Sequence, residues 1–552
     1  MPANPIKVEP TKGHSLTRVV LASAAGTTFE WYDFFLFVPL AGIISKLFFA
    51  GLNDTAAYVF ALLSFGAGLI LRPVGALIFG WTGDRVGRKA TFLITITLMG
   101  AATFAIGFLP TYADAGILSP ILFIGLRMLQ GIAIGGEWGG AAIYIAEHAP
   151  VNRRGFLTGC LGTCAAFGLG GALVVTLITR TIVGEEAFVV WGWRVPFLLS
   201  AVLVAFSIWM RLKLQESPAF TALRESNGLS KAPYSEAFLH WPNTKRVFLA
   251  LFALMFAQGS VWYLTFLYTQ FFLERILKVT PAFANTAMLT VVALSAPLYL
   301  MFGALSDRIG RKWIMFFGMT LVIAMLFPGF KLLTKFANPA IYAAASASPV
   351  TVIADPNDCS VQFDPVGKAQ FRSSCDIAKT LLTSGGVPYT NEAAPAGSVT
   401  VVKIGDAAVT SVDGRALDDT TLKSERARVE GELKSALRAA GYPEQASAED
   451  ANLLGVIAVL MIFVIGATAL YGPQPAALVE LFPIRVRYTA LSLPYHVGTG
   501  WVGGLLPAAS YAMVAATGDI YFGLWYALVM TAISATVTLF FLPETRGRDL
   551  NV

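Results

Sequence analysis

Twelve long apolar stretches dominate this 552-residue sequence and restrict what it can fold into. They occupy residues 19–44, 57–80, 90–109, 120–146, 156–182, 194–211, 247–272, 285–306, 313–334, 452–472, 488–514 and 520–542. A helix needs about 20 mostly apolar residues to cross a bilayer. We therefore predict an all-α integral membrane protein with twelve transmembrane helices. The composition agrees, because only 13% of the residues are charged, whereas an average soluble protein has about 25%.

Lys and Arg gather in every second loop. The loops after the second, fourth, eighth and tenth stretches hold Arg85, Arg88 and Lys89; Arg153 and Arg154; Arg308, Arg311 and Lys312; and Arg485 and Arg487. The opposite loops, around Asp114 and Asp519, have almost no positive charge. Because positive loops stay in the cytoplasm, we expect both termini to be cytoplasmic in a bacterial-type inner membrane. The same loops account for the net charge of +6, so we expect no nucleic-acid partner.

One ten-residue segment occurs twice. Gly80–Lys89 (GWTGDRVGRK) and Gly303–Lys312 (GALSDRIGRK) match at six of ten positions, and each follows the second helix of its half. A second similarity ends each half, at Gln215–Pro218 and at Leu542–Arg546. Since transporters are often built from internal repeats, we predict two bundles of six helices each.

The paired segments resemble the signature of the major facilitator superfamily. Four further segments resemble its metabolite:proton symporter branch: Thr28–Phe34, Arg127–Gly131 with Gly135–Ala141, Trp191–Phe197 and Glu480–Thr489. The resemblance implies the major facilitator fold and proton-coupled uptake of a small polar metabolite, such as an organic acid or a zwitterionic osmolyte, by alternating access. An uncoupled facilitator or exchanger remains an alternative, as does a transporter-like sensor.

The spans and the polar segments divide the chain into seven parts. We predict a cytoplasmic tail (1–17), an N-terminal six-helix bundle (18–212), a cytoplasmic loop between the bundles (213–245), helices 7–9 of the C-terminal bundle (246–335), an extracytoplasmic insertion (336–450), helices 10–12 (451–543) and a second cytoplasmic tail (544–552).

The insertion is too polar to span a membrane, and we predict that it forms a small α+β domain. Residues 399–404 and 408–412 have the pattern of two strands around a turn at Gly405–Asp406. A helix is expected from Asp418 or Asp419 to Ala440, where Gly441 and Pro443 end it. In an oxidising compartment Cys359 and Cys375 can form a disulfide; the alternative is two free thiols in a flexible loop.

Charged residues inside the spans are the candidates for mechanism, because an ionised side chain at mid-bilayer costs about 2.5–3.5 kcal/mol. Glu30 and Asp33 share one face of the first helix, and Arg127, Gln130 and Trp138 share a face of the fourth. Our hypothesis is that Glu30 or Asp33 carries the proton, with Arg127 as competing counter-ion or anion ligand. The alternative is a permanent pair that only holds the two helices together.

Other residues inside the spans allow two interpretations. Glu137 lies among four glycines and either gates a close helix contact or binds substrate directly. Arg72 either faces the interior or extends to the interface. In the C-terminal half the candidate pocket-lining residues are Gln258, Trp262, Tyr263, Tyr495 and His496. His496 is either a coupling residue or a packing residue.

The repeated segments also allow a mechanical interpretation. Asp84 and Asp307 can face the positive N-terminal end of a neighbouring helix. Acidic side chains across the halves can pair with arginines of the repeat, namely Arg85, Arg88, Arg308 and Arg311, and the candidate partners are Glu147 and Glu480. The resemblance implies that these segments latch a cytoplasmic gate; the alternative is that they only fix the topology.

The sequence contains no phosphate-binding G-x-x-x-x-G-K-[ST] loop and no cysteine and histidine cluster with zinc spacing. We therefore expect no cofactor, no metal and no enzymatic activity. The expected partners are a small-molecule substrate, protons and the lipid bilayer, and the expected state is a monomer.

Overall fold

The computed structural model describes residues 16–50, 54–213, 215–360 and 371–550. Nine helices in these ranges are long and apolar enough to cross a membrane, or ten if the pair α1–α2, bent by 46°, is one span. The other two predicted stretches coincide with α3 and with the run from α22 to α23. Every predicted span therefore lies in a helical segment, although most of the predicted tail 1–17 falls outside the described residues.

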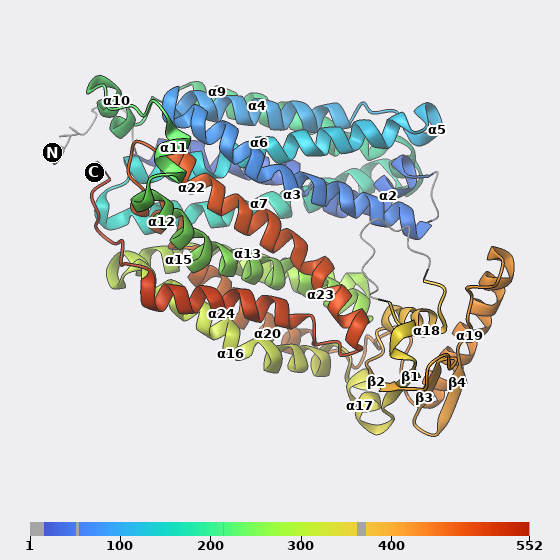
Figure 1. Cartoon of the computed structure of the whole chain (residues 1–552). Coiled ribbons are helices and arrows are strands. Elements are labelled where there is room, and N and C mark those ends of the chain that lie inside the picture. The colour runs from blue at the N-terminus through green and yellow to red at the C-terminus, as the bar shows by residue number, and fades with distance from the viewer. Residues whose placement is uncertain (1–15, 51–53, 214, 361–370, 551–552) are drawn as a thin grey trace.

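The N-terminal half is a bundle of long helices (Figure 1). These are α1 (Leu16–Phe35), α2 (Phe37–Phe48), α3 (Asp54–Arg85), α4 (Arg88–Ile106), α6 (Leu118–His148), α7 (Arg154–Val183) and α9 (Arg194–Leu212). The loops hold the short helices α5 (Tyr112–Ala115) and α8 (Glu185–Ala187). Helix α6 packs against α3 and α4, and α1 packs against α7 and α9. A cluster of buried aromatic and aliphatic side chains fills the space between them.

The C-terminal half forms the second bundle, after two short helices α10 (Pro218–Glu225) and α11 (Pro233–Phe238). Its first span, Trp241–Ile276, includes α12 (Trp241–Leu249), α13 (Phe256–Tyr263) and α14 (Thr269–Phe271), joined by π-helical turns. The others are α15 (Pro281–Ile309), α16 (Arg311–Ala337), α20 (Leu453–Tyr471), α21 (Gln474–Leu481), α22 (Arg487–His496), the π-helical η7 (Val497–Gly503), α23 (Gly504–Thr517) and α24 (Leu524–Phe541).

The two halves meet along two helix pairs, α7 with α15 and α3 with α22. Glycine makes the first crossing close: a Cβ atom on Gly155 would lie 2.5 Å from the carbonyl oxygen of Gly303. At the second crossing a Cβ atom on Gly80 would lie 2.8 Å from the Cα atom of Thr489. Gly80 and Gly303 begin the two repeated segments, so the repeat places a small residue at both crossings.

The insertion folds as a small α+β domain. Its sheet has the order β2-β1-β3-β4, with β1 (Val350–Ala354) parallel to β2 (Tyr389–Ala393) and antiparallel to β3 (Val401–Ile404), which pairs with β4 (Ala407–Thr410). Its helices are α17 (Pro339–Ala347), α18 (Ser374–Ser384) and α19 (Asp419–Ala439). The predicted hairpin and long helix are present, and Asp418 caps α19 by accepting from the amides of Thr420 and Thr421. The structure adds β1, β2, α17 and α18, and a disulfide joins Cys359 to Cys375.

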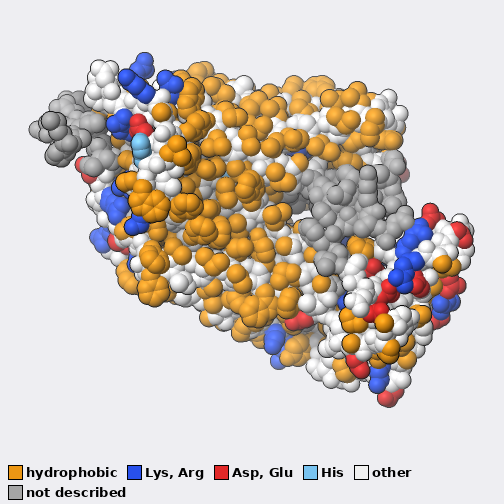
Figure 2. Space-filling view, in the orientation of Figure 1, with side chains coloured by type: hydrophobic (Ala, Val, Ile, Leu, Met, Phe, Trp, Pro, Cys, Tyr) orange, Lys and Arg blue, Asp and Glu red, His pale blue; other side chains and the backbone are white. Residues whose placement is uncertain are grey.

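The charged groups lie at the two ends of the molecule. Figure 1 places the insertion at one end of the long helices, and α10 and α11 at the other. In Figure 2 the visible surface between these ends is mostly hydrophobic, and the Lys, Arg, Asp and Glu side chains gather mainly at the ends. Large apolar side chains are exposed on the long helices, for example Leu177, Ile178 and Ile182 of α7. A surface of this kind suits lipid rather than water.

Candidate functional site

Three buried charged side chains meet inside the N-terminal bundle. Arg211, in the last turn of α9, places Nη2 2.5 Å from Oε1 of Glu137 and Nη1 3.7 Å from Oε1 of Glu30. Thr95 donates a hydrogen bond of 3.1 Å to the second oxygen of Glu137. One guanidinium therefore lies between two carboxylates, and we call these three residues the Glu30–Arg211–Glu137 triad. The sequence prediction did not select Arg211, since a cation at the end of an apolar stretch is also typical of a side chain that extends to the interface.

The predicted pairing with Arg127 is wrong for the described conformation. Glu30 forms its ion pair with Arg211, and Asp33 accepts a hydrogen bond of 2.5 Å from Ser200. Arg127 donates instead to Gln130 at 2.7 Å and lies over the rings of Phe34 and Phe37. The periodicity of the helices correctly placed these residues inside the bundle. It did not say which helices adjoin, and α9 supplies the cation for α1.

An aromatic cluster joins the two bundles at their centre. The Trp138 ring stacks on Tyr495 with 3.5 Å between centroids, and its indole donates to the Tyr471 hydroxyl at 3.0 Å. The hydroxyls of Tyr471 and Tyr495 lie 3.2 Å apart. Trp262 donates to the Tyr299 hydroxyl at 3.3 Å. Tyr299 and Tyr471 were not predicted, because an aromatic residue in an apolar stretch is also typical of packing.

Several polar side chains of the C-terminal half are buried beside this cluster. The rings of Tyr495 and His496 have centroids 4.9 Å apart, and Tyr263 contacts Trp262. Oε1 of Gln258, Oε1 of Gln474 and both ring nitrogens of His496 are buried without a hydrogen-bond partner in the described ranges. Buried polar groups are normally hydrogen-bonded, so these atoms are available to water or to a ligand.

The space at this centre is small in the described conformation. A cavity of about 10 Å³ lies here, which is room for about one water molecule. It is lined by Thr27, Glu30, Trp31, Ile134, Glu137 and Trp138. A second cavity of similar size is lined by residues that include Trp262, Ser295 and Tyr299. Two residues of the triad therefore border a small space next to Trp138.

Arg72 in α3 faces the interior, which excludes extension to the interface in this conformation. The residue is only 1% exposed. Its guanidinium lies 4.6 Å from the ring centroid of Phe34 and 5.6 Å from that of Trp31. Both rings belong to the N-terminal bundle.

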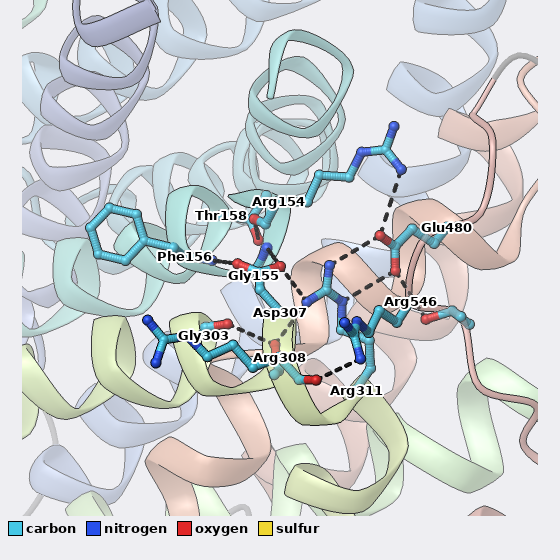
Figure 3. A network of polar contacts seen from close by, with 12 residues as sticks. Arg154, Gly155, Phe156, Thr158, Gly303, Asp307, Arg308, Arg311, Glu480 and Arg546 are labelled. Atoms are coloured by element: carbon cyan, nitrogen blue, oxygen red, sulfur yellow. Dashed lines mark hydrogen bonds and ion pairs between the residues drawn. The ribbon is translucent and has the colours of Figure 1, made fainter. Parts of the chain in front are cut away.

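A network around Asp307 holds the halves together at the end opposite the insertion (Figure 3). Asp307 accepts hydrogen bonds of 2.8 Å from the amides of Gly155 and Phe156, at the N-terminus of α7. Arg311 lies 2.6 Å from Asp307 and 3.1 Å from Glu480, and Arg154 lies 3.7 Å from Glu480. We call these residues the Asp307 cluster.

The equivalent network surrounds Asp84. Its carboxylate accepts from the amides of Tyr488 at 3.1 Å and Thr489 at 2.8 Å, at the N-terminus of α22. Arg88 lies 2.8 Å from Asp84, and Arg487 lies 2.8 Å from Glu147. We call these residues the Asp84 cluster. Both aspartates therefore face the N-terminal end of a helix in the opposite half, where the helix dipole favours a negative charge.

Among the residues that the structure describes, the arginines of the repeated segments do not pair with acids across the halves, contrary to our prediction. Arg88 and Arg311 bind acids of their own half, and Arg85 and Arg308 are exposed. The ion pairs between the halves are made by Arg154 with Glu480 and by Arg487 with Glu147. Arg154 and Arg487 lie at the starts of α7 and α22, outside the repeated segment, so the repeat did not point to them.

The second sequence similarity has a structural counterpart too. Glu216 accepts from the amides of Arg88 and Lys89 at 3.1 and 3.2 Å. Glu544 accepts from the amides of Arg311 and Lys312 at 2.9 and 3.2 Å. In each half, then, an acid that follows the sixth span caps the N-terminus of the third.

Comparison with known proteins agrees with this architecture. The model of the family "Sugar (and other) transporter" matches residues 19–236 and 439–552. The proline/betaine transporter of Salmonella typhimurium is 34% identical over 343 residues, which are 59% of this chain and 67% of that protein. The shikimate transporter of Escherichia coli is 34% identical over 319 residues, which are 57% of this chain and 72% of that protein.

Solved structures share the fold. The proton:xylose symporter XylE, a major facilitator superfamily protein bound to 6-bromo-6-deoxy-D-glucose, superposes with a TM-score of 0.64 at 16% identity, covering 97% of this chain and 98% of that one. The matched family is one of membrane transporters and not of enzymes. The chain therefore belongs to the Sugar (and other) transporter family and has the fold of the major facilitator superfamily.

Proposed function

We propose that this protein takes up a small polar metabolite, an organic acid or a zwitterionic osmolyte, together with a proton. It acts by alternating access in a bacterial inner membrane, with both termini in the cytoplasm and the insertion outside. The observation that carries the proposal is the Glu30–Arg211–Glu137 triad, in which two buried carboxylates share one guanidinium.

The triad supplies a proton site. With both carboxylates ionised, one negative charge is not compensated by Arg211, and buried charge without compensation is costly. Arg211 is closer to Glu137, and Oε1 of Glu30 is buried with no hydrogen-bond partner in the described ranges. A proton on Glu30 therefore leaves a neutral Arg211–Glu137 pair. Glu30 also lines the cavity beside Trp138, so a proton can reach it whenever that cavity opens.

The two clusters at the helix ends supply the gate. Each carries one aspartate bound to helix amides of the other half and one ion pair between the halves. Both lie at the end that we assign to the cytoplasm. Separating the bundles at that end breaks both clusters, so their formation favours the conformation closed to the cytoplasm.

The aromatic centre supports a zwitterionic substrate. Cations bind over the faces of Trp and Tyr rings, and Trp138, Tyr495, Trp262 and Tyr299 bring such rings to the boundary between the bundles. The named relatives that are transporters of proline and betaine handle compounds of this kind. The shikimate transporter keeps an organic acid among the candidates.

Proton uptake driven by substrate in proteoliposomes tests the coupling. We expect Glu30→Gln to abolish substrate-driven alkalinisation of the outer solution. Asp33→Asn is measured beside it, because Asp33 is a second buried acid and accepts a hydrogen bond from the neutral Ser200. The control is Glu185→Gln, a change of an exposed acid on a loop helix. If both Glu30→Gln and Asp33→Asn keep wild-type coupling, the uncoupled facilitator is favoured. The same conclusion follows if uptake by the wild-type protein is unchanged when the pH gradient is collapsed.

A further inference from the structure

Arg72 lies where the two halves meet. It belongs to α3, which packs against η7 of the C-terminal bundle, and a Cβ atom on Gly500 would lie 3.7 Å from the Cβ atom of Arg72. Its guanidinium lies over the ring of Trp31, which borders the same small cavity as Trp138. Its guanidinium is therefore placed beside the aromatic cluster at the centre of the protein.

Arg72 has no acidic partner in the part of the chain that the structure describes. Its Nε and Nη2 atoms are buried without a hydrogen-bond partner, and it forms no ion pair within the same ranges. Five other arginines are equally buried, at 1% exposed: Arg88, Arg127, Arg211, Arg311 and Arg487. Four of them bind a carboxylate, and Arg127 donates to the side chain of Gln130. Because a buried cation is normally paired, Arg72 needs an anion that the described residues do not provide.

The free atoms have a shape that suits a carboxylate. Nε and Nη2 lie on one edge of the planar guanidinium, and their N–H groups point the same way. That edge matches the two oxygens of a carboxylate in a bidentate arrangement. The rings of Trp31 and Phe34 contact the guanidinium and hold it away from water. The site thus offers two preorganised donors in a dry environment.

We propose that Arg72 binds the carboxylate of the transported substrate, with the rest of the molecule against Trp138, Tyr471 and Tyr495. This inference rests on the proposed function. It selects carboxylated substrates, whether zwitterions or organic acids, over neutral sugars and over cations that lack a carboxylate. It also gives Arg72 a role separate from the Glu30–Arg211–Glu137 triad.

The wild-type protein alone provides the first test. Binding to the purified protein in lipid nanodiscs is measured for two matched pairs, glycine betaine with choline and L-proline with L-prolinamide. Each second compound keeps the cationic part and lacks the carboxylate. We expect the carboxylated member of at least one pair to bind roughly 10- to 100-fold more tightly, the range for a hydrogen bond to a charged partner. Equal affinity within both pairs overturns the proposal without requiring any variant to fold.

Two variants assign the preference to Arg72. We expect Arg72→Gln to bind both members of the preferred pair with similar affinity, and Arg72→Lys to keep part of the preference because it keeps the charge but not the planar pair of donors. Arg180→Gln is the control, since Arg180 is partly exposed at the end of α7 beside Glu185. A full preference for the carboxylated compound in Arg72→Gln overturns the proposal.

The failure of this inference is distinct from the failure of the proposed function. If Arg72→Gln keeps the preference while Glu30→Gln loses proton coupling, only the role of Arg72 is wrong. If the wild-type protein binds neither zwitterions nor organic acids, the proposed function fails, and the role of Arg72 fails with it.

Discussion

Asp84 and Asp307 occupy equivalent positions in the two halves, and each carboxylate accepts hydrogen bonds from the first amides of a helix in the opposite half. The duplication is therefore visible in contacts as well as in sequence. The two aspartates exchange partners between the halves: the N-terminal aspartate binds α22, and the C-terminal aspartate binds α7. In each half, the N-terminus of one helix therefore binds the aspartate of the opposite half.

Removing the charge of Asp84 should slow transport without removing substrate binding. Asp84→Asn keeps one acceptor for the α22 amides but loses the charge that favours the helix N-terminus and the partner of Arg88. We expect initial uptake in proteoliposomes to fall roughly three- to tenfold, while the Kd for substrate changes little. Asp114→Asn, which changes an exposed acid on α5, is the control. Wild-type uptake by Asp84→Asn would leave the cluster with a role in topology only.

The close crossing of α7 and α15 should tolerate no methyl group. Gly155→Ala places a Cβ atom 2.5 Å from the carbonyl oxygen of Gly303, so the two backbones must separate. Their separation strains the Asp307 cluster, whose amides come from Gly155 and Phe156. We expect uptake to fall at least roughly tenfold, since overpacking costs about 1–3 kcal/mol.

A matched glycine on the same helix provides the control. A Cβ atom on Gly170 meets nothing within 4 Å, so Gly170→Ala should transport like the wild-type protein. If Gly155→Ala also transports normally, the crossing does not need to close during the cycle.

The helices could be predicted from the sequence, because crossing a bilayer requires long apolar stretches that hydropathy reveals directly. The contacts of Asp84 and Asp307 with helix N-termini could be predicted equally well, since a repeated motif fixes both its position and its geometry. The partner of Glu30 could not be predicted. Periodicity places Glu30 on a face of α1, but only the packing of α9 beside α1 decides that Arg211 reaches it.

In the insertion, too, the local structures could be predicted from the sequence and the long-range contacts could not. A hairpin and a capped helix are local structures, so Gly405 and Asp418 marked them in the sequence. The parallel pairing of β1 with β2 joins residues about forty positions apart, across α18. Such pairing depends on tertiary contacts rather than on a local sequence signal such as a turn residue, so it could not be predicted.

The disulfide should stabilise the insertion, while the other cysteines stay reduced. Cys359 and Cys375 are bonded, and Cys160 and Cys164 are free thiols in α7. Alkylation of the denatured, unreduced protein should therefore modify two cysteines, rising to four after reduction. The double substitution of Cys359 and Cys375 by Ser should lower the stability of the insertion by about 3 kcal/mol, measured by its thermal unfolding. Four modified cysteines before reduction would contradict the pairing.

The insertion is fixed to one end of the C-terminal bundle. Tyr389 donates through its amide to Gly518 at 3.0 Å and through its hydroxyl to Ala515 at 2.7 Å, and Asn391 donates to Thr517 at 2.6 Å. The amide of Ala446 donates to the carbonyl of Lys278 at 2.9 Å. These contacts all involve loops or helix ends of one bundle, so we expect the insertion to move with that bundle during transport.

Removing the insertion should leave uptake intact. This experiment distinguishes a transporter from a sensor that uses this domain to bind its ligand. The amide of Asn452 donates to the carbonyl of Phe336 at 2.8 Å, so the ends of α16 and α20 already adjoin. Residues 339–450 can therefore be replaced by a short Gly-Ser linker with little loop-closure cost. Because the triad, the aromatic cluster and Arg72 all lie outside the insertion, we expect uptake within about twofold of the wild-type rate. If the shortened protein folds, as judged by its elution and thermal unfolding, but no longer binds or transports substrate, the insertion takes part in binding or gating.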